Sequence, residues 1–409
     1  MDVMTDQQTT GPMAPWSAVF ALSLCAASVV AAEWMPVSLL TPIADSLQLT
    51  EGQAGQAIAV SGLFAVLTSL FISAATRGID RRSLLLWLTG ATLVSGIVVA
   101  FAPNYPVFMV GRALVGVAVG GFWSMSAATM IRIVPGKDVP RALAILNGGN
   151  AVATTIAAPF GSFLGQYIGW RGAFFCVVPI AALTLIWQFV TLPEMPSRER
   201  ASAVAAFKVL RRPGVSYGML AAALFFLGQF ALFTYLRPFF ETVTRIDVTT
   251  ISALLLVMGV AGLVGTSLIG FVIRRRLYAS LVLMPFTMAG MAVALTTYGS
   301  SLGATAALMS LWGFIGTAAP VGWWTWLSRA LPDDAEAGGG LMVAVIQLAI
   351  TMGAAGGGVL FDTSGYRATF LFSAGILALS ASVILIGVLR RRARADSQCA
   401  GCVPASPAM

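Results

Sequence analysis

The chain has 409 residues, of which 58% are hydrophobic and only 10% are charged, and its formal net charge is +8. A soluble domain carries about 25% charged residues, so this chain has too little charge to cover a soluble surface of its size. The alternating segments of about ten residues that are typical of a transmembrane β-barrel are absent from the sequence. We therefore expect an all-α membrane protein.

Taken in chain order, the apolar runs are long enough to cross a hydrocarbon core of about 30 Å. They predict twelve transmembrane helices, at roughly 16–40, 52–75, 84–102, 107–130, 142–168, 172–191, 214–236, 251–273, 278–297, 302–326, 340–361 and 369–389. A basic stretch with three prolines separates the sixth span from the seventh. This pattern indicates a tail (1–15), a six-helix bundle (16–192), a linker (193–213), a second six-helix bundle (214–389) and a second tail (390–409).

The basic residues are distributed unevenly between the two sides of the predicted membrane. Nineteen of the 24 Lys and Arg residues lie in loops and a tail that share a side with both termini, whereas four lie in the opposite loops: Arg171, Arg237, Arg245 and Arg367. Cytoplasmic loops carry such an excess, so we expect a bacterial inner-membrane protein with both termini in the cytoplasm. Because the charge follows topology, we expect no nucleic-acid partner.

Metal and cofactor chemistry have little support in the sequence. There is no histidine, and Cys399 and Cys402 form a CxxC pair in the second tail without further ligands nearby. Structural zinc usually takes four ligands. No P-loop is present, which argues against direct use of ATP. We therefore expect no metal and no cofactor.

The two predicted bundles contain an internal repeat. Gly169–Phe174 recurs as Gly365–Phe370 at an offset of 196 residues, and the same offset places Glu33 opposite Gln229. It also places Leu40-Thr41-Pro42 opposite Leu236-Arg237-Pro238. Two parallel six-helix repeats are typical of transporters that bind their solute near the midplane, between the halves.

Two charged residues fall clearly inside the predicted spans, Glu33 in the first and Arg112 in the fourth. A charge at mid-bilayer costs about 2.5–3.5 kcal/mol or more, so such residues are usually functional or paired. Their similar predicted depth permits an ion pair, which could also be purely structural. Because a carboxylate can carry a proton, Glu33 and Arg112 are the candidate proton-coupling residues.

Aromatic and amide side chains within the spans form the candidate substrate site. They are Phe122, Trp123, Asn147, Asn150, Gln229, Phe233, Tyr235, Trp323, Trp324 and Gln347. Amides beside aromatic faces suit a flat, neutral, hydrogen-bonding ring, although aromatic residues also gather at membrane interfaces. Small residues allow helices to approach closely. The candidate helix-packing positions are Gly116, Gly120, Pro159 and Gly161.

Several of these motifs resemble a known family. Arg112 with Gly116 and Gly120, and Ala158-Pro159-Phe160-Gly161, resemble the span-four and span-five motifs of the drug:proton antiporter branch of the major facilitator superfamily. The segments most similar to bacterial purine ribonucleoside efflux pumps are Pro36–Pro42, Gly120–Trp123, Gly161–Gly165, Gly228–Ala231, Phe233–Tyr235, Pro320–Trp323 and Val343–Ala349. The resemblance covers nearly the whole chain except both tails.

This resemblance implies a major facilitator fold and a proton-coupled antiporter that exports inosine and guanosine by alternating access. Its ligands would be a purine nucleoside and protons, within a lipid bilayer, and we expect a monomer. One alternative is a broader exporter of drugs or sugars on the same scaffold. A more distant alternative is a non-transporting receptor or an intramembrane enzyme. We do not expect an enzyme, because the sequence has no HExxH motif and no credible catalytic dyad.

Overall fold

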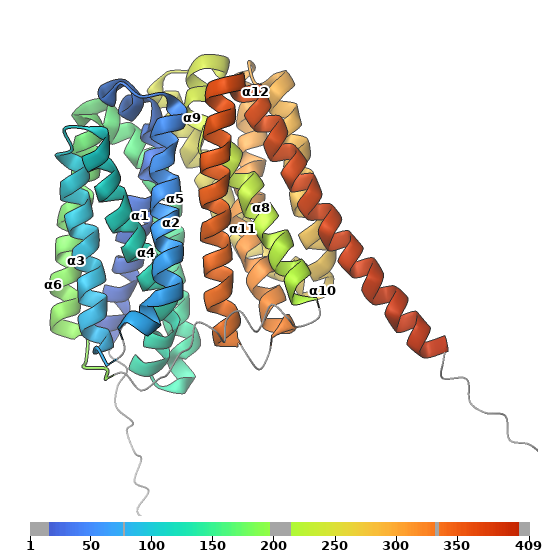
Figure 1. Ribbon diagram of the computed structural model, residues 1–409, viewed down its shortest axis with the longest axis horizontal. Helices are drawn as coiled ribbons and strands as arrows, with labels where there is room; N and C mark the ends of the chain where they lie inside the picture. The colour runs from blue at the N-terminus through green and yellow to red at the C-terminus, as the bar shows by residue number, and fades with distance from the viewer. Residues whose placement is uncertain (1–15, 77, 197–213, 332–334, 401–409) are drawn as a thin grey trace, which may run out of the picture.

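The computed structural model describes residues 16–76, 78–196, 214–331 and 335–400 (Figure 1). Regular structure within these residues is helical throughout. The first part of the chain forms α1 (Trp16–Leu47), α2 (Glu51–Ala75), α3 (Arg81–Ala100), α4 (Tyr105–Ile133), the short η1 (Gly136–Asp138), α5 (Val139–Phe175) and α6 (Val177–Thr191). The second part forms α8 (Val215–Phe233), α9 (Leu236–Phe239), the π-helix η2 (Phe240–Thr244), α10 (Val248–Tyr298), α11 (Leu302–Ala330) and α12 (Ala335–Ala400).

Three helical stretches are long enough to cross a membrane twice, and each contains a break. The breaks lie at Gly169 in α5, Arg276 in α10 and Gly365 in α12. Gly169 and Gly365 have φ values of 71° and 77°, a left-handed conformation that favours glycine. The described residues contain nine apolar helical stretches of membrane-spanning length, and dividing the three long ones at their breaks is consistent with the twelve predicted spans.

Helix starts are fixed by polar side chains. Thr50, Asp80 and Asn104 accept hydrogen bonds from backbone N–H groups in the first turns of α2, α3 and α4. The first helix is longer than predicted, because α1 passes through Pro42 and continues to Leu47 rather than ending near residue 40. Pro42 removes one backbone donor without ending the helix.

The helices pack into two hydrophobic cores. One core draws its residues from 18–195 together with Tyr235, and the other draws them from 215–384 together with four residues of the first half: Val37, Ile58, Ala59 and Ala158. We call these units the N half and the C half. In Figure 1 the start of α1 and the end of α6 lie at one end of the bundle, which we call the terminal end. The short α9 lies at the opposite end, which we call the α9 end.

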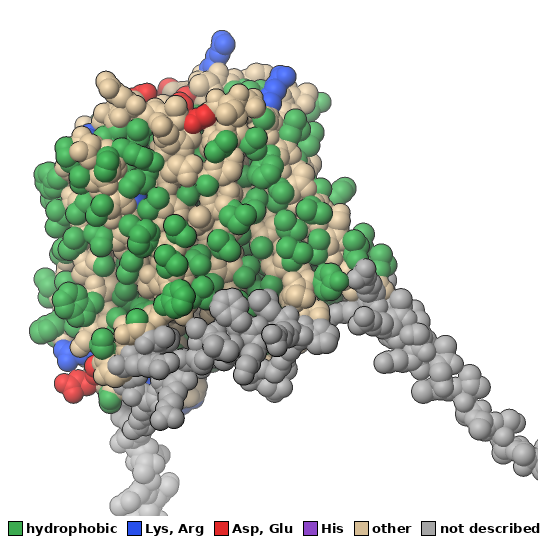
Figure 2. Space-filling model, in the orientation of Figure 1, with side chains coloured by type: hydrophobic (Ala, Val, Ile, Leu, Met, Phe, Trp, Pro, Cys, Tyr) green, Lys and Arg blue, Asp and Glu red, His purple; other side chains and the backbone are tan. Residues whose placement is uncertain are grey.

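The sides of the bundle are apolar. Figure 2 shows hydrophobic side chains over the flank and charged side chains near the two ends. Large apolar side chains such as Trp87 and Phe271 are 77% and 73% exposed. An apolar surface of this extent suits contact with lipid. The chain is thus a multi-pass membrane protein.

Candidate functional site

The two halves are in close contact at the α9 end. The Asp362 carboxylate of α12 accepts hydrogen bonds from the Thr50 hydroxyl at 2.6 Å and from the Gly52 N–H at 2.9 Å, both at the start of α2. Nearby, Tyr235 is fully buried and lies so close to Gly55 that a methyl group on Gly55 would overlap the tyrosine ring. These contacts join the halves along this part of α2 and α12.

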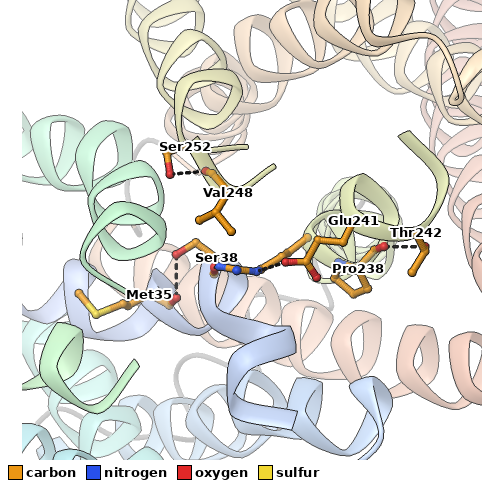
Figure 3. Close-up of polar contacts among 8 residues, drawn as sticks. Met35, Ser38, Pro238, Glu241, Thr242, Val248 and Ser252 are labelled. Atoms are coloured by element: carbon orange, nitrogen blue, oxygen red, sulfur yellow. Dashed lines mark hydrogen bonds and ion pairs between the residues drawn. The ribbon is translucent and has the colours of Figure 1, made fainter. Parts of the chain in front are cut away.

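Arg237 adds a further contact at the α9 end. Its guanidinium donates to the backbone carbonyl of Ser38 in α1, and its Nε donates to Glu241 at 2.8 Å (Figure 3). Arg237 is only 5% exposed. The assignment of Arg237 to a loop was therefore wrong, because the residue lies in α9, between the two halves.

Toward the terminal end the halves separate, as the exposure of α1 shows. Trp34 packs against the C half, and Ala31, Ala27 and Phe20 follow at helical spacing on the same face. Ala31 and Ala27 are half-buried, and Phe20 is 49% exposed. In contrast, every residue from Met35 to Leu40 is buried. The face of α1 that touches the C half at Trp34 is thus uncovered toward the terminal end.

Helix α5 shows the same divergence. Near its middle, the Thr155 hydroxyl lies 3.5 Å from the carbonyl of Gly259 in α10. One and two turns earlier on the same face, Ala151 is half-buried, and Gly148 is exposed with no atom within 4 Å of a methyl group placed there. The space between the halves therefore opens to the terminal end and closes at the level of Trp34 and Thr155.

Glu33 lies where the halves first meet. It is 5% exposed, and its carboxylate accepts a hydrogen bond from Nε2 of Gln347 at 3.0 Å. Glu33 belongs to α1 and Gln347 to α12, so this bond joins the two halves. Glu33 is fourteen residues from the end of α1, or about 21 Å along the helix.

Arg112 does not form the expected ion pair. Its guanidinium donates to the carbonyls of Ala32 at 2.7 Å, Glu33 at 2.9 Å and Ala57 at 3.2 Å, whereas the Glu33 carboxylate is bound to the C half. In a regular helix the Ala32 carbonyl would accept from residue 36, which is proline and has no N–H. Arg112 thus supplies the donor that Pro36 removes from α1.

Trp34 provides an aromatic surface beside Glu33. Its ring is stacked on Phe230 at 4.8 Å and meets Phe233 edge-on at 6.5 Å, so the two halves also meet through aromatic rings. We did not select Trp34 from the sequence. The sequence contained one signal for Trp34: it directly follows Glu33 inside a predicted span. An aromatic ring at the same depth in the membrane as the candidate coupling residue is a candidate for the substrate site.

The predicted substrate residues divide into two groups. Phe122 and Trp323 are buried in the cores of their own halves, and Tyr235 is buried at the α9 end, so in this conformation none of the three has surface for a solute. The remainder are exposed (Asn147 and Trp324), half-buried (Trp123, Asn150, Gln229 and Phe233) or, for Gln347, bonded to Glu33. Within this second group, Gln229 is half-buried with an Oε1 atom that has no hydrogen-bond partner.

Comparison with known proteins places this arrangement in a family. The sequence profile of the Major Facilitator Superfamily matches residues 22–353. The chain belongs to the major facilitator superfamily. The predicted fold and the predicted resemblance are both confirmed.

Solved major facilitator structures have a similar fold. One is a bacterial homologue of the human lysosomal transporter Spinster in an inward-facing and unoccupied conformation. Its TM-score is 0.74 at 14% identity, and the match covers 92% of this chain and 97% of that chain. A D-xylose–proton symporter has a TM-score of 0.70 at 16% identity, covering 90% and 96%.

Two curated relatives are much more similar in sequence. The transcription regulatory protein OpdE of Pseudomonas aeruginosa is 56% identical over 91% of this chain and 93% of its own length. The purine ribonucleoside efflux pump NepI of Salmonella paratyphi C is 41% identical over 90% of this chain and 93% of its own length.

The candidate packing glycines of this major facilitator protein lie at close helix contacts. A methyl group on Gly116 or Gly120 of α4 would overlap the carbonyl oxygen of Ser61 or Ala65 in α2. Around the span-five motif, a methyl group on Gly161 would lie 2.8 Å from the Ser38 hydroxyl oxygen. These helices approach each other as closely as the missing side chains allow.

Gly116→Ala is expected to destabilise the protein by about 1–3 kcal/mol, because the added methyl group must displace backbone rather than a flexible side chain. Thermal unfolding of the detergent-purified protein measures this change. Gly148→Ala is the matched control, since Gly148 faces open space within helix α5. Equal melting temperatures for Gly116→Ala and the wild type would contradict the close-packing argument.

Proposed function

We propose that this protein is a proton-coupled antiporter that exports purine ribonucleosides such as inosine and guanosine by alternating access. The observation that carries the proposal is the hydrogen bond between Glu33 and Gln347, at 3.0 Å, which joins the two halves at the closed end of the space between them. Glu33 is also the one acidic side chain buried among the residues that the structure describes.

The chemistry of Glu33 favours exchange. A buried carboxylate can bind a proton, or it can accept a hydrogen bond from a donor such as the Gln347 amide. The ring N–H of a hypoxanthine or guanine base is a donor of the same kind and can replace that amide. Because protonation removes the charge that strengthens this hydrogen bond, proton and nucleoside compete for one group. Such competition produces antiport.

The surroundings of Glu33 suit a purine base. The Trp34 ring offers a flat apolar surface and stacks on Phe230 of the opposite half. Gln229, the residue before Phe230, carries a side-chain acceptor without a hydrogen-bond partner. Aromatic stacking and amide hydrogen bonds together fit a planar, neutral, polar ring. The 41% identity to a purine ribonucleoside efflux pump supports this substrate class.

The distribution of basic residues indicates which side of the membrane the open space faces. The basic loops lie at the terminal end, so the terminal end is cytoplasmic by the positive-inside rule. The space between the halves then opens to the cytoplasm, where an exporter collects its substrate. A fold similar to that of an inward-facing, unoccupied transporter is consistent with this assignment.

Transport in inverted membrane vesicles tests the proposed function. When the vesicle interior is acidified, labelled inosine is expected to accumulate in vesicles that contain the protein, and collapse of the pH gradient is expected to abolish the accumulation. Vesicles without the protein are the control. Accumulation of lipophilic cations or sugars with no accumulation of inosine would favour the broader exporter instead.

A second candidate function comes from the 56% identity to a transcription regulatory protein. An exporter changes the internal concentration of its substrate and can alter transcription without touching DNA. A regulator that acts by itself would alter transcription even when transport is blocked. Transcript levels in cells with the Glu33→Gln variant, which is expected to lose proton-driven export, separate the two, because persistence of the wild-type transcript pattern would favour direct regulation.

A further inference from the structure

Helix α1 has a backbone acceptor at the α9 end that its own helix cannot satisfy. In a regular helix the Ser38 carbonyl would accept a hydrogen bond from the N–H of residue 42. Residue 42 is proline, which has no N–H, and Ser38 is fully buried. The hydroxyl of Ser38 does not satisfy this carbonyl either, because it donates to the Met35 carbonyl at 3.1 Å (Figure 3). A buried, unsatisfied carbonyl in a membrane is costly, so an external donor is required.

Arg237 is that donor, and it comes from the other half. Its guanidinium reaches from α9 to the Ser38 carbonyl, while Glu241 accepts from its Nε at 2.8 Å. Glu241 is one helical turn further along the chain, and its ion pair with Arg237 fixes the guanidinium in place beside the Ser38 carbonyl. The bond has a charged donor, which makes it stronger than a bond between neutral groups.

The contrast with Arg112 shows what is special about this bond. Arg112 supplies the donor that Pro36 removes, but Arg112 and Ala32 both belong to the N half. That bond can therefore persist while the halves rock as rigid units. The bond from Arg237 crosses between the halves, so it must break whenever the α9 end opens.

The internal repeat shows that this contact is made by one half only. Pro238 occupies the repeat position of Pro42, and Thr41 occupies that of Arg237. The Thr41 hydroxyl oxygen has no hydrogen-bond partner. The equivalent contact from the N half to the C half is therefore not made. A single arginine therefore supplies this type of contact between the described halves.

We propose that Arg237 holds the α9 end closed by donating to the carbonyl that Pro42 frees in α1. This inference rests on the alternating-access part of the proposed function and does not depend on the substrate. It assigns to Pro42 and Arg237 a joint role in setting which side of the membrane the site faces. Removing either member of the pair shifts the protein toward a conformation that is open at the α9 end.

Distances between spin labels on the purified full-length protein in lipid nanodiscs test the proposal. Cysteines for labelling replace Asp45 of α1 and Thr249 of α10, which are exposed, in a background without the four native cysteines. Arg237→Ala is expected to raise the population with the longer distance by about tenfold or more, the equivalent of one charge-assisted hydrogen bond. Arg237→Lys, which keeps one charged donor, is expected to restore part of the closed population.

Two further variants keep the test decisive. Pro42→Ala returns the missing N–H to α1 and leaves Arg237 in place, so it is expected to open the α9 end even if Arg237→Ala folds poorly. Arg245→Ala removes an exposed arginine eight residues from Arg237 and is expected to leave the distances unchanged. Wild-type distances in both Arg237→Ala and Pro42→Ala, or an equal shift in Arg245→Ala, would overturn the proposal. Because no substrate is used, failure of inosine transport would leave this result unaffected.

Discussion

Replacement of Glu33 by Gln is expected to abolish pH-driven accumulation of inosine while leaving the protein folded. Gln has nearly the same shape as Glu and can accept the hydrogen bond from Gln347, but it cannot bind and release a proton. A proton that moves through 100 mV releases about 2.3 kcal/mol, and a tenfold gradient costs about 1.4 kcal/mol, so one proton per solute supports a gradient of roughly fiftyfold. We expect Glu33→Gln to support no inosine concentration gradient.

Two measurements in proteoliposomes check this expectation. The first is accumulation of labelled inosine driven by a pH gradient, which Glu33→Gln should lose. The second is exchange of labelled for unlabelled inosine without a gradient, which should persist because exchange needs no proton. Asp45→Asn is the matched control, since Asp45 is an exposed carboxylate on the same helix. If Glu33→Gln accumulates inosine like the wild type, coupling must be assigned to another carboxylate, with Asp362 the next candidate.

Replacement of Arg112 by Ala is expected to destabilise the protein by about 3 kcal/mol, because a buried carbonyl loses its only donor and several charge-assisted hydrogen bonds are lost with it. If Glu33 and Arg112 formed an ion pair, Glu33→Gln would rescue Arg112→Ala by removing an unpaired charge. The structure predicts a different rescue. Pro36→Ala returns an N–H to the Ala32 carbonyl and should recover about 1–2 kcal/mol of the loss.

Thermal unfolding of the four proteins in the Arg112 and Pro36 double-mutant cycle measures this coupling. The cycle should show a favourable interaction between the two substitutions. As a control, Pro285→Ala changes a proline within α10 of the C half and should not rescue Arg112→Ala. Rescue by Glu33→Gln but not by Pro36→Ala would restore the ion-pair interpretation.

Much of the fold could be predicted because membrane segments obey one strong constraint. An apolar run of sufficient length has few alternatives to a helix, so the spans were visible in the sequence. The glycine at the repeated turn was visible as well, since Gly169 and Gly365 adopt the same left-handed conformation. Helix ends were less predictable. The first span was predicted to end near residue 40, but α1 continues through Pro42 to Leu47, and Arg237 replaces the donor that Pro42 removes.

The site was harder to predict because depth along a helix does not show which way a side chain faces. Glu33 and Arg112 were identified as the buried charges of the spans, but they face different partners. Gln347 was selected as a substrate residue, although in this conformation it binds Glu33. Trp34 was missed, and Arg237 was assigned to a loop. Each error depends on contacts between helices that are distant in the sequence.

The turns at Gly169 and Gly365 constrain how the molecule can change shape. Each turn occupies a single residue at the junction of two long helical segments, so the segments of a pair are pinned together where they meet. The two helical segments of such a pair stay together at the turn that joins them, so they move as one unit. Within the proposed alternating-access cycle, opening at the α9 end then comes from tilting of whole halves. The deformation falls on the contacts between the halves, such as the bond from Arg237 to Ser38.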